Sequence, residues 1–283
     1  MIADQLTDPI AFHGEGAFWD ARGQRLLWVD MLAGDILATD SAAISTRHHV
    51  GTVAAALRSR ASGGFVIAVE RGFVFADADL VVRERLPEVF ADSSIRMNDG
   101  GCDPQGRFYC GTMAYAETPG AGTIYRLDPD LTTSVVLDGV TISNGLQWSA
   151  DGSRAFYNDT PTGRTDVFDF DGASGTFSNR RPFVTLEPGQ NPDGMAIDAE
   201  DGLWIPLWGG SAANHYDSSG RLVDTVELPV TNVTSCAFGG PDLDTLYITT
   251  SRLGLAEGTQ PKAGSIFVAR PGVRGATPHA FAG

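Results

Sequence analysis

The stretch DPQGRFYCG (residues 103–111) joins a turn rich in Asp, Pro and Gly to a short apolar strand. Turns of this composition connect antiparallel strands, and the same unit recurs along the chain. The turns begin at residues 20, 61, 103, 150, 198 and 240. Strands are predicted after them at 25–30, 65–69, 107–111, 154–158, 203–207 and 245–249, with further strands at 34–38, 72–75, 122–126, 165–168 and 264–268.

The spacing of these units indicates the fold class. Successive turns lie 41, 42, 47, 48 and 42 residues apart, and a period of roughly 40–45 residues with several short strands is typical of propeller blades. Six units fit the 283 residues. We therefore predict an all-β, six-bladed β-propeller as a single domain over residues 1–283, in preference to a solenoid, which needs capping units. We expect residues 1–12 and 275–283 to share one blade.

Charge and composition exclude several classes of partner. The formal net charge is −15, which argues against binding to nucleic acid or to an anionic membrane surface. No stretch approaches the roughly 20 apolar residues of a membrane-spanning helix. Residues 1–10 lack the pattern of a signal peptide, so a cytoplasmic location is expected. The sequence leaves the oligomeric state open.

Four repeats carry a carboxylate or carboxamide near the same position, about five residues before the turn. These residues are Glu15, Asn98, Asn144 and Asp193, and a glycine follows each within two residues. Asn-Gly and Asp-Gly pairs are turn formers when taken singly. Their shared position instead favours a ring around the central channel, because the innermost strand of each blade precedes the turn. Acidic groups crowded in a narrow channel require a compensating cation.

The chemistry of this ring predicts a metal centre. Glu15, Asn144 and Asp193 supply hard oxygen ligands, which suit Ca²⁺, Mg²⁺ or Mn²⁺ better than a structural zinc. We expect one divalent metal ion in the channel: Ca²⁺, or alternatively Mg²⁺, Mn²⁺ or Zn²⁺. The ion would polarise an ester carbonyl, and Asp193 would act as general base.

Neighbouring residues complete the predicted site. Arg96 and Asn98 are candidates for hydrogen bonds to substrate hydroxyls or to a developing oxyanion. Asp99 is expected to point away from the channel, because consecutive strand residues face opposite sides. His13 is expected to line the mouth without a catalytic role. No G-x-S-x-G or P-loop pattern is present, so neither a serine hydrolase nor a nucleotide cofactor is indicated.

Several motifs in order resemble the SMP-30/gluconolactonase/LRE-like family, which includes regucalcin, over essentially the whole chain. They are GEGAFWD (14–20), RMNDGGCDPQGRFYCGTM (96–113), SNGLQWSADGSRAFYNDT (143–160), NPDGMAIDAEDGLW (191–204) and TSCAFGGPDLDTLYITT (234–250). The resemblance implies a six-bladed propeller with a divalent metal held by Glu15, Asn144 and Asp193, and Asp193 doubling as catalytic acid/base. It also implies substrate contacts at Arg96 and Asn98. A further family glutamate matches Glu117 only approximately.

The function that follows is a metal-dependent lactonase. It would hydrolyse a small-molecule sugar (aldono-) lactone, such as gluconolactone, to the aldonic acid. Two alternatives stay open at this point. One is an aryl-esterase or organophosphatase on the same scaffold, because a fold does not fix a function. The other is a non-catalytic, calcium-binding propeller.

Overall fold

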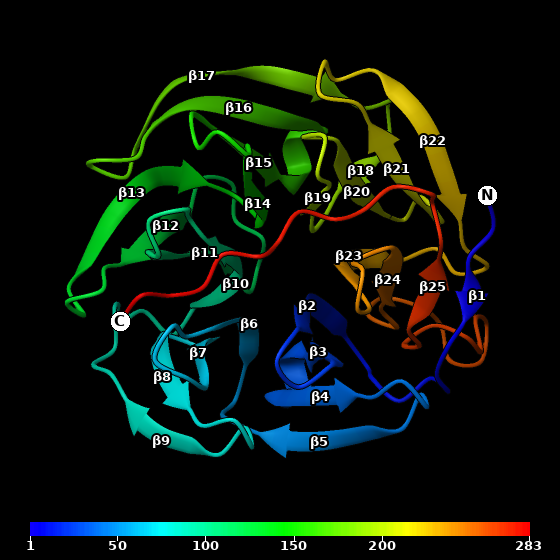
Figure 1. Cartoon of the computed structure of the whole chain (residues 1–283), viewed down its shortest axis with the longest axis horizontal. Coiled ribbons are helices and arrows are strands. Elements are labelled where there is room, and N and C mark those ends of the chain that lie inside the picture. Colours follow the sequence, from blue (N-terminus) through cyan, green and yellow to red (C-terminus); the bar gives the residue numbers. More distant parts are fainter.

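Six antiparallel sheets surround a central axis in the computed structural model, which describes residues 1–283 (Figure 1). This arrangement confirms the predicted six-bladed propeller. Within each sheet the strands pair with their neighbours from the channel outward. The inner strands of adjacent blades contact one another, so residues at equivalent positions of different blades meet around the axis.

The first three blades are each built from four consecutive strands. Blade one contains β2 (Gly14–Asp20), β3 (Arg25–Asp30), β4 (Asp35–Thr39) and β5 (Ser45–His49). Blade two contains β6 (Ala54–Ser59), β7 (Phe65–Val69), β8 (Gly72–Ala76) and β9 (Val82–Arg85). Blade three contains β10 (Ile95–Cys102), β11 (Phe108–Ala114), β12 (Gly122–Leu127) and β13 (Thr133–Val140).

The remaining blades follow the same plan with two departures, a split inner strand in blade five and a borrowed outer strand in blade six. Blade four contains β14 (Ser143–Trp148), β15 (Arg154–Asp159), β16 (Arg164–Asp171) and β17 (Thr176–Thr185). Blade five contains β18 (Asn191–Pro192), β19 (Ala196–Ile197), β20 (Leu203–Trp208), β21 (Ala212–Tyr216) and β22 (Leu222–Glu227). Blade six contains β23 (Val233–Gly239), β24 (Thr245–Thr250), β25 (Phe267–Ala269) and β1 (Asp4–Gln5).

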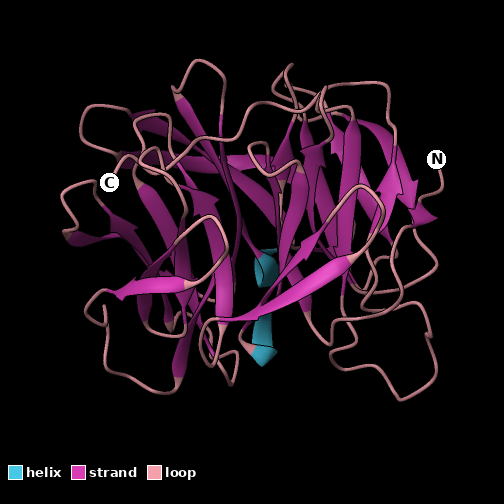
Figure 2. Ribbon diagram, turned by 60° about the horizontal axis from the view of Figure 1, so that its bottom comes forward, coloured by secondary structure: helices cyan, strands magenta, loops and turns pink.

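Two single-turn helices, η1 (Met31–Ala33) and η2 (Thr160–Thr162), follow β3 and β15 (Figure 2). Neither is long and apolar enough to cross a membrane. The cytoplasmic location stays a prediction.

The two ends of the chain play different parts. β1 pairs with β25, so the N-terminal segment completes blade six, as expected. The expectation for residues 275–283 is wrong, because they run across one end of the channel instead of joining that blade (Figure 1). Phe281 is fully buried against Phe75 of blade two, with ring centroids 6.0 Å apart. An apolar site in another blade therefore holds the C-terminal end.

Aromatic side chains pack between adjacent blades and hold the ring of sheets together. Such pairs are Trp19–Tyr247, Phe73–Phe108, Tyr109–Trp148 and Trp204–Phe238, with centroids 5.1–5.7 Å apart. These distances lie in the range where aromatic pairs add to the free energy of burial.

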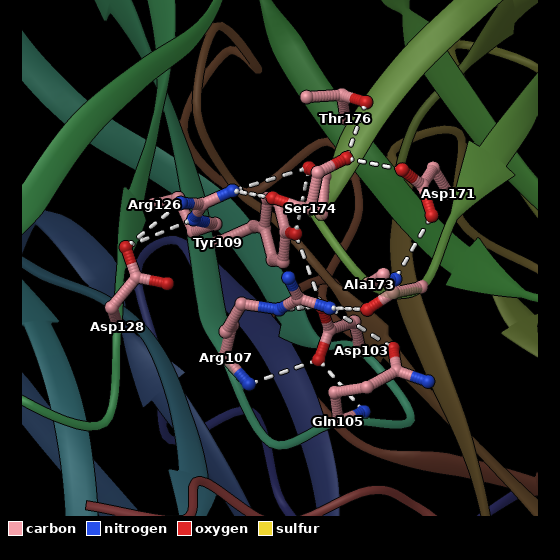
Figure 3. A network of polar contacts seen from close by, with 12 residues as sticks. Asp103, Gln105, Arg107, Tyr109, Arg126, Asp128, Asp171, Ala173, Ser174 and Thr176 are labelled. Atoms are coloured by element: carbon pink, nitrogen blue, oxygen red, sulfur yellow. Dashed lines mark hydrogen bonds and ion pairs between the residues drawn. The ribbon is translucent and has the colours of Figure 1, made fainter.

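A polar network adds a second connection between blades three and four (Figure 3). Asp103, in the turn between β10 and β11, accepts hydrogen bonds from Arg107 Nε at 2.6 Å and from the Tyr109 hydroxyl at 3.1 Å. Arg107 also donates to the carbonyl of Gly172, and Arg126 Nη1 donates to the carbonyl of Ser174 at 2.7 Å. Since residues 172 and 174 lie in the loop between β16 and β17, the turn aspartate anchors a contact between two blades.

Candidate active site

The pairing between each inner strand and the second strand of its blade is irregular at one shared level of the channel. Register shifts occur in β2 after Glu15, in β10 after Met97 and in β14 after Ser143, and β6 and β23 have equivalent shifts. In blade five the inner strand is split, and Asp193 lies between β18 and β19. A β-bulge re-aims side chains and bends its strand. The predicted ring residues lie at these bulges, so their Asn-Gly and Asp-Gly pairs are not turns.

The glycines of this level are required by close approach between blades. Gly145 donates its backbone N–H to the carbonyl of Asp193 at 3.1 Å, and Gly194 donates to the carbonyl of Thr234 at 2.7 Å. A Cβ atom on Gly145 would lie 2.6 Å from the Cβ of Met195, closer than side chains tolerate. Glycine therefore lets adjacent inner strands hydrogen-bond directly and narrows the channel.

The six residues predicted to bind metal or substrate or to act in catalysis line one pocket of about 570 Å³ at the end of the channel away from the C-terminal segment. Five of them lie on the inner strands or at their breaks, and each is 4–5% exposed: Glu15, Arg96, Asn98, Asn144 and Asp193. The sixth, Glu117, is exposed on the loop after β11 at the rim. His13 lines the same pocket, as expected.

The carboxamide of Asn144 is oriented by its neighbours. The Thr160 hydroxyl donates to the carbonyl of Pro192 at 2.8 Å, so its oxygen accepts the 2.7 Å hydrogen bond from Asn144 Nδ2. Asn144 Oδ1 is thereby turned away from Thr160 and accepts from Asn98 Nδ2 at 3.0 Å. One lone pair of Oδ1 stays free for a ligand.

Arg96 and Asn98 form a connected pair. Arg96 Nη1 donates to Asn98 Oδ1 at 2.6 Å and to the Met97 carbonyl at 3.0 Å. Both amide hydrogens of Asn98 are used, by Asn144 and by the Ser143 carbonyl. Asn98 therefore orients its neighbours and has no free donor, whereas Arg96 Nε and Nη2 have no partner within the protein and can bind a substrate.

The two carboxylates of the ring are buried with little compensation. The pKa of Glu15 is raised to about 8, mainly by burial and secondly by the negative charge of Asp99. Burial and the charges of Glu15 and Asp99 likewise raise the pKa of Asp193 well above its usual value. The chain has no group of three or more His, Cys, Asp or Glu side chains arranged to hold a metal. Two carboxylates and one carboxamide oxygen nevertheless fit a hard divalent cation, which would offset their repulsion.

These pKa shifts predict how the metal-free protein responds to pH. An acid with a raised pKa holds a proton in the folded state that the unfolded chain releases, so stability is lost as pH rises from about 4.5 towards the raised value. Burial lowers the pKa of His13 to about 3 and also lowers that of His279. A histidine with a lowered pKa makes the folded protein more stable as the pH rises, but this gain in stability is complete above about pH 6.5.

We therefore expect the melting temperature in chelator to fall between pH 6.5 and 8. A saturating divalent cation should remove most of this fall, because it takes the place of the protons. Differential scanning calorimetry at several pH values checks this expectation. A melting temperature in chelator that is flat or rises over this range would contradict the raised pKa values of Glu15 and Asp193.

Asp99 does not point away from the channel, contrary to expectation. The bulge between Met97 and Gly100 breaks the alternation of side chains, and Asp99 lines a second cavity of about 230 Å³ that the C-terminal segment covers. Arg58 lies in the same cavity, and its charge partly offsets the rise that burial causes in the pKa of Asp99. Asp99 thus contributes negative charge beneath the ring.

Three further pocket residues were missed in the sequence. Tyr115 places its ring 5.9 Å from Arg96 Cζ and donates its hydroxyl to Glu70 at 2.6 Å. Thr160 orients Asn144, and Trp208 forms part of the pocket wall. Thr160 is the last residue of the motif at 143–160, and Tyr115 lies two residues after the motif at 96–113, but nothing in the local sequence marks either as a site residue.

Comparisons with known proteins show the family to which the chain belongs. Residues 13–252 match the model of the SMP-30/Gluconolactonase/LRE-like region. The chain is 37% identical to regucalcin of Bos taurus, over 95% of each chain. It is 34% identical to the putative sugar lactone lactonase YvrE of Bacillus subtilis, over 100% of this chain and 99% of the relative. A calcium-binding regucalcin structure from Agrobacterium tumefaciens superposes with a TM-score of 0.91 at 26% identity, covering 99% of this chain and 97% of that one. The chain therefore belongs to the SMP-30/gluconolactonase/LRE-like family.

Proposed function

We propose that this protein is a metal-dependent lactonase that hydrolyses a sugar lactone, such as gluconolactone, to the corresponding aldonic acid. The observation that carries the proposal is the convergence of Glu15, Asn144, Asp193 and Arg96 in one pocket. The sugar lactone lactonase among the relatives supports the substrate class. The polar donors of the pocket favour a hydroxylated lactone over an aryl ester or an organophosphate.

Glu15, Asn144 and Asp193 would hold one divalent cation, with Ca²⁺ favoured. Their oxygen atoms come from three different blades, and the Asn144 amide is already oriented towards the channel. The bound cation would polarise the lactone carbonyl as a Lewis acid.

The residues of the chain carry out the remaining steps. Asp193 accepts a proton from the attacking water as the water oxygen bonds to the carbonyl carbon. Arg96 donates from Nε or Nη2 to an oxygen of the substrate, and Asn98 keeps the Arg96 guanidinium in place at 2.6 Å. The ring C–O bond then breaks, and the proton held by Asp193 passes to the leaving oxygen, which gives the open-chain hydroxy acid.

A calcium-binding protein without catalysis is the second candidate, because the Agrobacterium relative is a calcium-binding protein. The two functions differ in what metal titration reveals. In a lactonase, metal occupancy and hydrolysis rise together over the same concentration range. In a pure binding protein, calorimetric metal binding occurs with no turnover of any lactone.

We expect Glu15→Gln to raise the metal concentration for half-maximal hydrolysis by about tenfold or more, because ligand charge sets the affinity of such sites. The rate at saturating metal should fall less than the affinity. The matched control is Glu84→Gln on the exposed strand β9, which should leave the titration unchanged. Superposable titrations for wild type and Glu15→Gln would remove Glu15 from the ligand set.

A further inference from the structure

The pocket wall contains two tiers of residues. The inner tier holds Glu15, Asn98, Asn144 and Asp193. Residues two positions earlier in the same four blades also line the pocket, and they are His13, Arg96, Ile142 and Asn191. Two residues of a strand span about 7 Å, so this outer tier lies roughly the width of a sugar ring nearer the mouth.

His13 of the outer tier is rigidly placed. Its backbone N–H donates to Asp30 Oδ1 at 3.0 Å, and its carbonyl accepts from the backbone N–H of Met31. Its ring stands edge-on to Trp208, with an interplanar angle of 87° and centroids 6.1 Å apart. His13 is 5% exposed and lines the pocket.

Hydrogen bonding fixes the tautomer of this imidazole. The fully buried Ser251 hydroxyl accepts from the backbone N–H of Leu253 at 3.0 Å and lies 2.9 Å from His13 Nδ1. No other acceptor is available for its proton, so Ser251 donates to Nδ1. A neutral imidazole whose Nδ1 accepts carries its proton on Nε2.

His13 Nε2 has no partner within the protein and is not sealed off from the pocket. A fixed N–H donor without a partner, above the predicted reacting centre, is suited to an acceptor oxygen on a substrate substituent. An aliphatic side chain of similar size could line the same wall, but it has no N–H to donate. It could therefore not distinguish a lactone that carries such an oxygen from one that does not.

We propose that His13 is a specificity-determining residue, whose Nε2–H donates a hydrogen bond to a hydroxyl oxygen of a polyhydroxylated lactone. Together with Arg96 across the outer tier, it selects hydroxylated lactones over unsubstituted ones. The inference rests on the proposed lactonase function for its substrate, but its geometry does not depend on the identity of the cation.

The test compares two six-membered lactones, gluconolactone and δ-valerolactone, at saturating divalent cation. The measured quantity is the ratio of their kcat/KM values. One hydrogen bond to a neutral group contributes about three- to tenfold, so His13→Leu should lower the gluconolactone preference by that factor. His13→Gln should retain more of the preference than His13→Leu, because its amide places a donor near the position of Nε2. His48→Leu, on the exposed outer strand β5, is the matched control and should leave the ratio unchanged.

The unreactive lactams corresponding to the two lactones provide a readout that does not require turnover. Calorimetric titration should show the same loss of discrimination in His13→Leu, even if the reaction class is wrong. An unchanged preference in His13→Leu, or equal losses in His13→Leu and His13→Gln, would overturn the inference. Absence of lactone turnover together with discriminating lactam binding would overturn the lactonase proposal alone.

Discussion

Asp193→Asn is expected to lower kcat for lactone hydrolysis by about 10²- to 10⁴-fold at saturating metal, the usual contribution of a general acid–base group. An amide can still ligate a cation weakly, but it cannot accept a proton from water. The fold should persist, because the backbone N–H of Asp193 bonds to Pro206 and its carbonyl accepts from Gly145 and Asn158, all independently of the carboxylate.

The measurement is a full metal titration of the initial rate, so that lost affinity is separated from lost chemistry. Asp4→Asn, on the exposed strand β1, is the matched control and should behave as wild type. A kcat within a few-fold of wild type in Asp193→Asn would remove this residue from the proton-transfer step.

Asp103→Ala is expected to lower the free energy of unfolding by about 3–5 kcal/mol, because removing one partner of a buried ion pair leaves an uncompensated charge. The side chains of Asp103 and Arg107 are 0% and 8% exposed, and Arg107 Nε lies 2.6 Å from Asp103 Oδ2. The variant also removes the side-chain acceptor of the backbone N–H groups of residues 105 and 107 and one of the two acceptors near the Tyr109 hydroxyl. Chemical denaturation checks this value.

Asp171→Ala in the same network provides the comparison (Figure 3). Asp171 is exposed and accepts only from the loop residues Ala173 and Ser174, so its loss should cost about 1 kcal/mol or less. Equal effects of the two variants would show that the buried pair does not connect blades three and four as described.

The blade repeat could be predicted because its signals are local. Five of the six predicted second strands begin at the observed residue, for instance Arg25 and Thr245, and the other begins one residue late at Phe108. These strands are covered on both faces, so their sequences are short runs of apolar residues. The outer strands could not be predicted, because exposed segments such as β17 (Thr176–Thr185) carry no alternating apolar pattern.

The ring of the site could be predicted because rotational repetition brings equivalent residues of different blades together. What lies beyond the ring depends on three-dimensional detail. The bulge in β10 turns Asp99 into the channel against the alternation rule, and the amide hydrogens of Asn98 are used within the protein. The orientation of Asn144 depends on Thr160, whose hydroxyl is committed to Pro192 in another blade. Contacts of this kind leave no signal in a single sequence.

The measurement that tests the central claim most directly is lactone hydrolysis, followed by proton release, with spontaneous ring opening subtracted. A panel of aldonolactones and simple lactones is assayed in chelator and then with Ca²⁺, Mg²⁺, Mn²⁺ or Zn²⁺ restored one at a time. We predict no enzymatic turnover in chelator and metal-restored hydrolysis of a sugar lactone. If no lactone is hydrolysed with any of these ions, the ring of Glu15, Asn144 and Asp193 is not the centre of a lactonase.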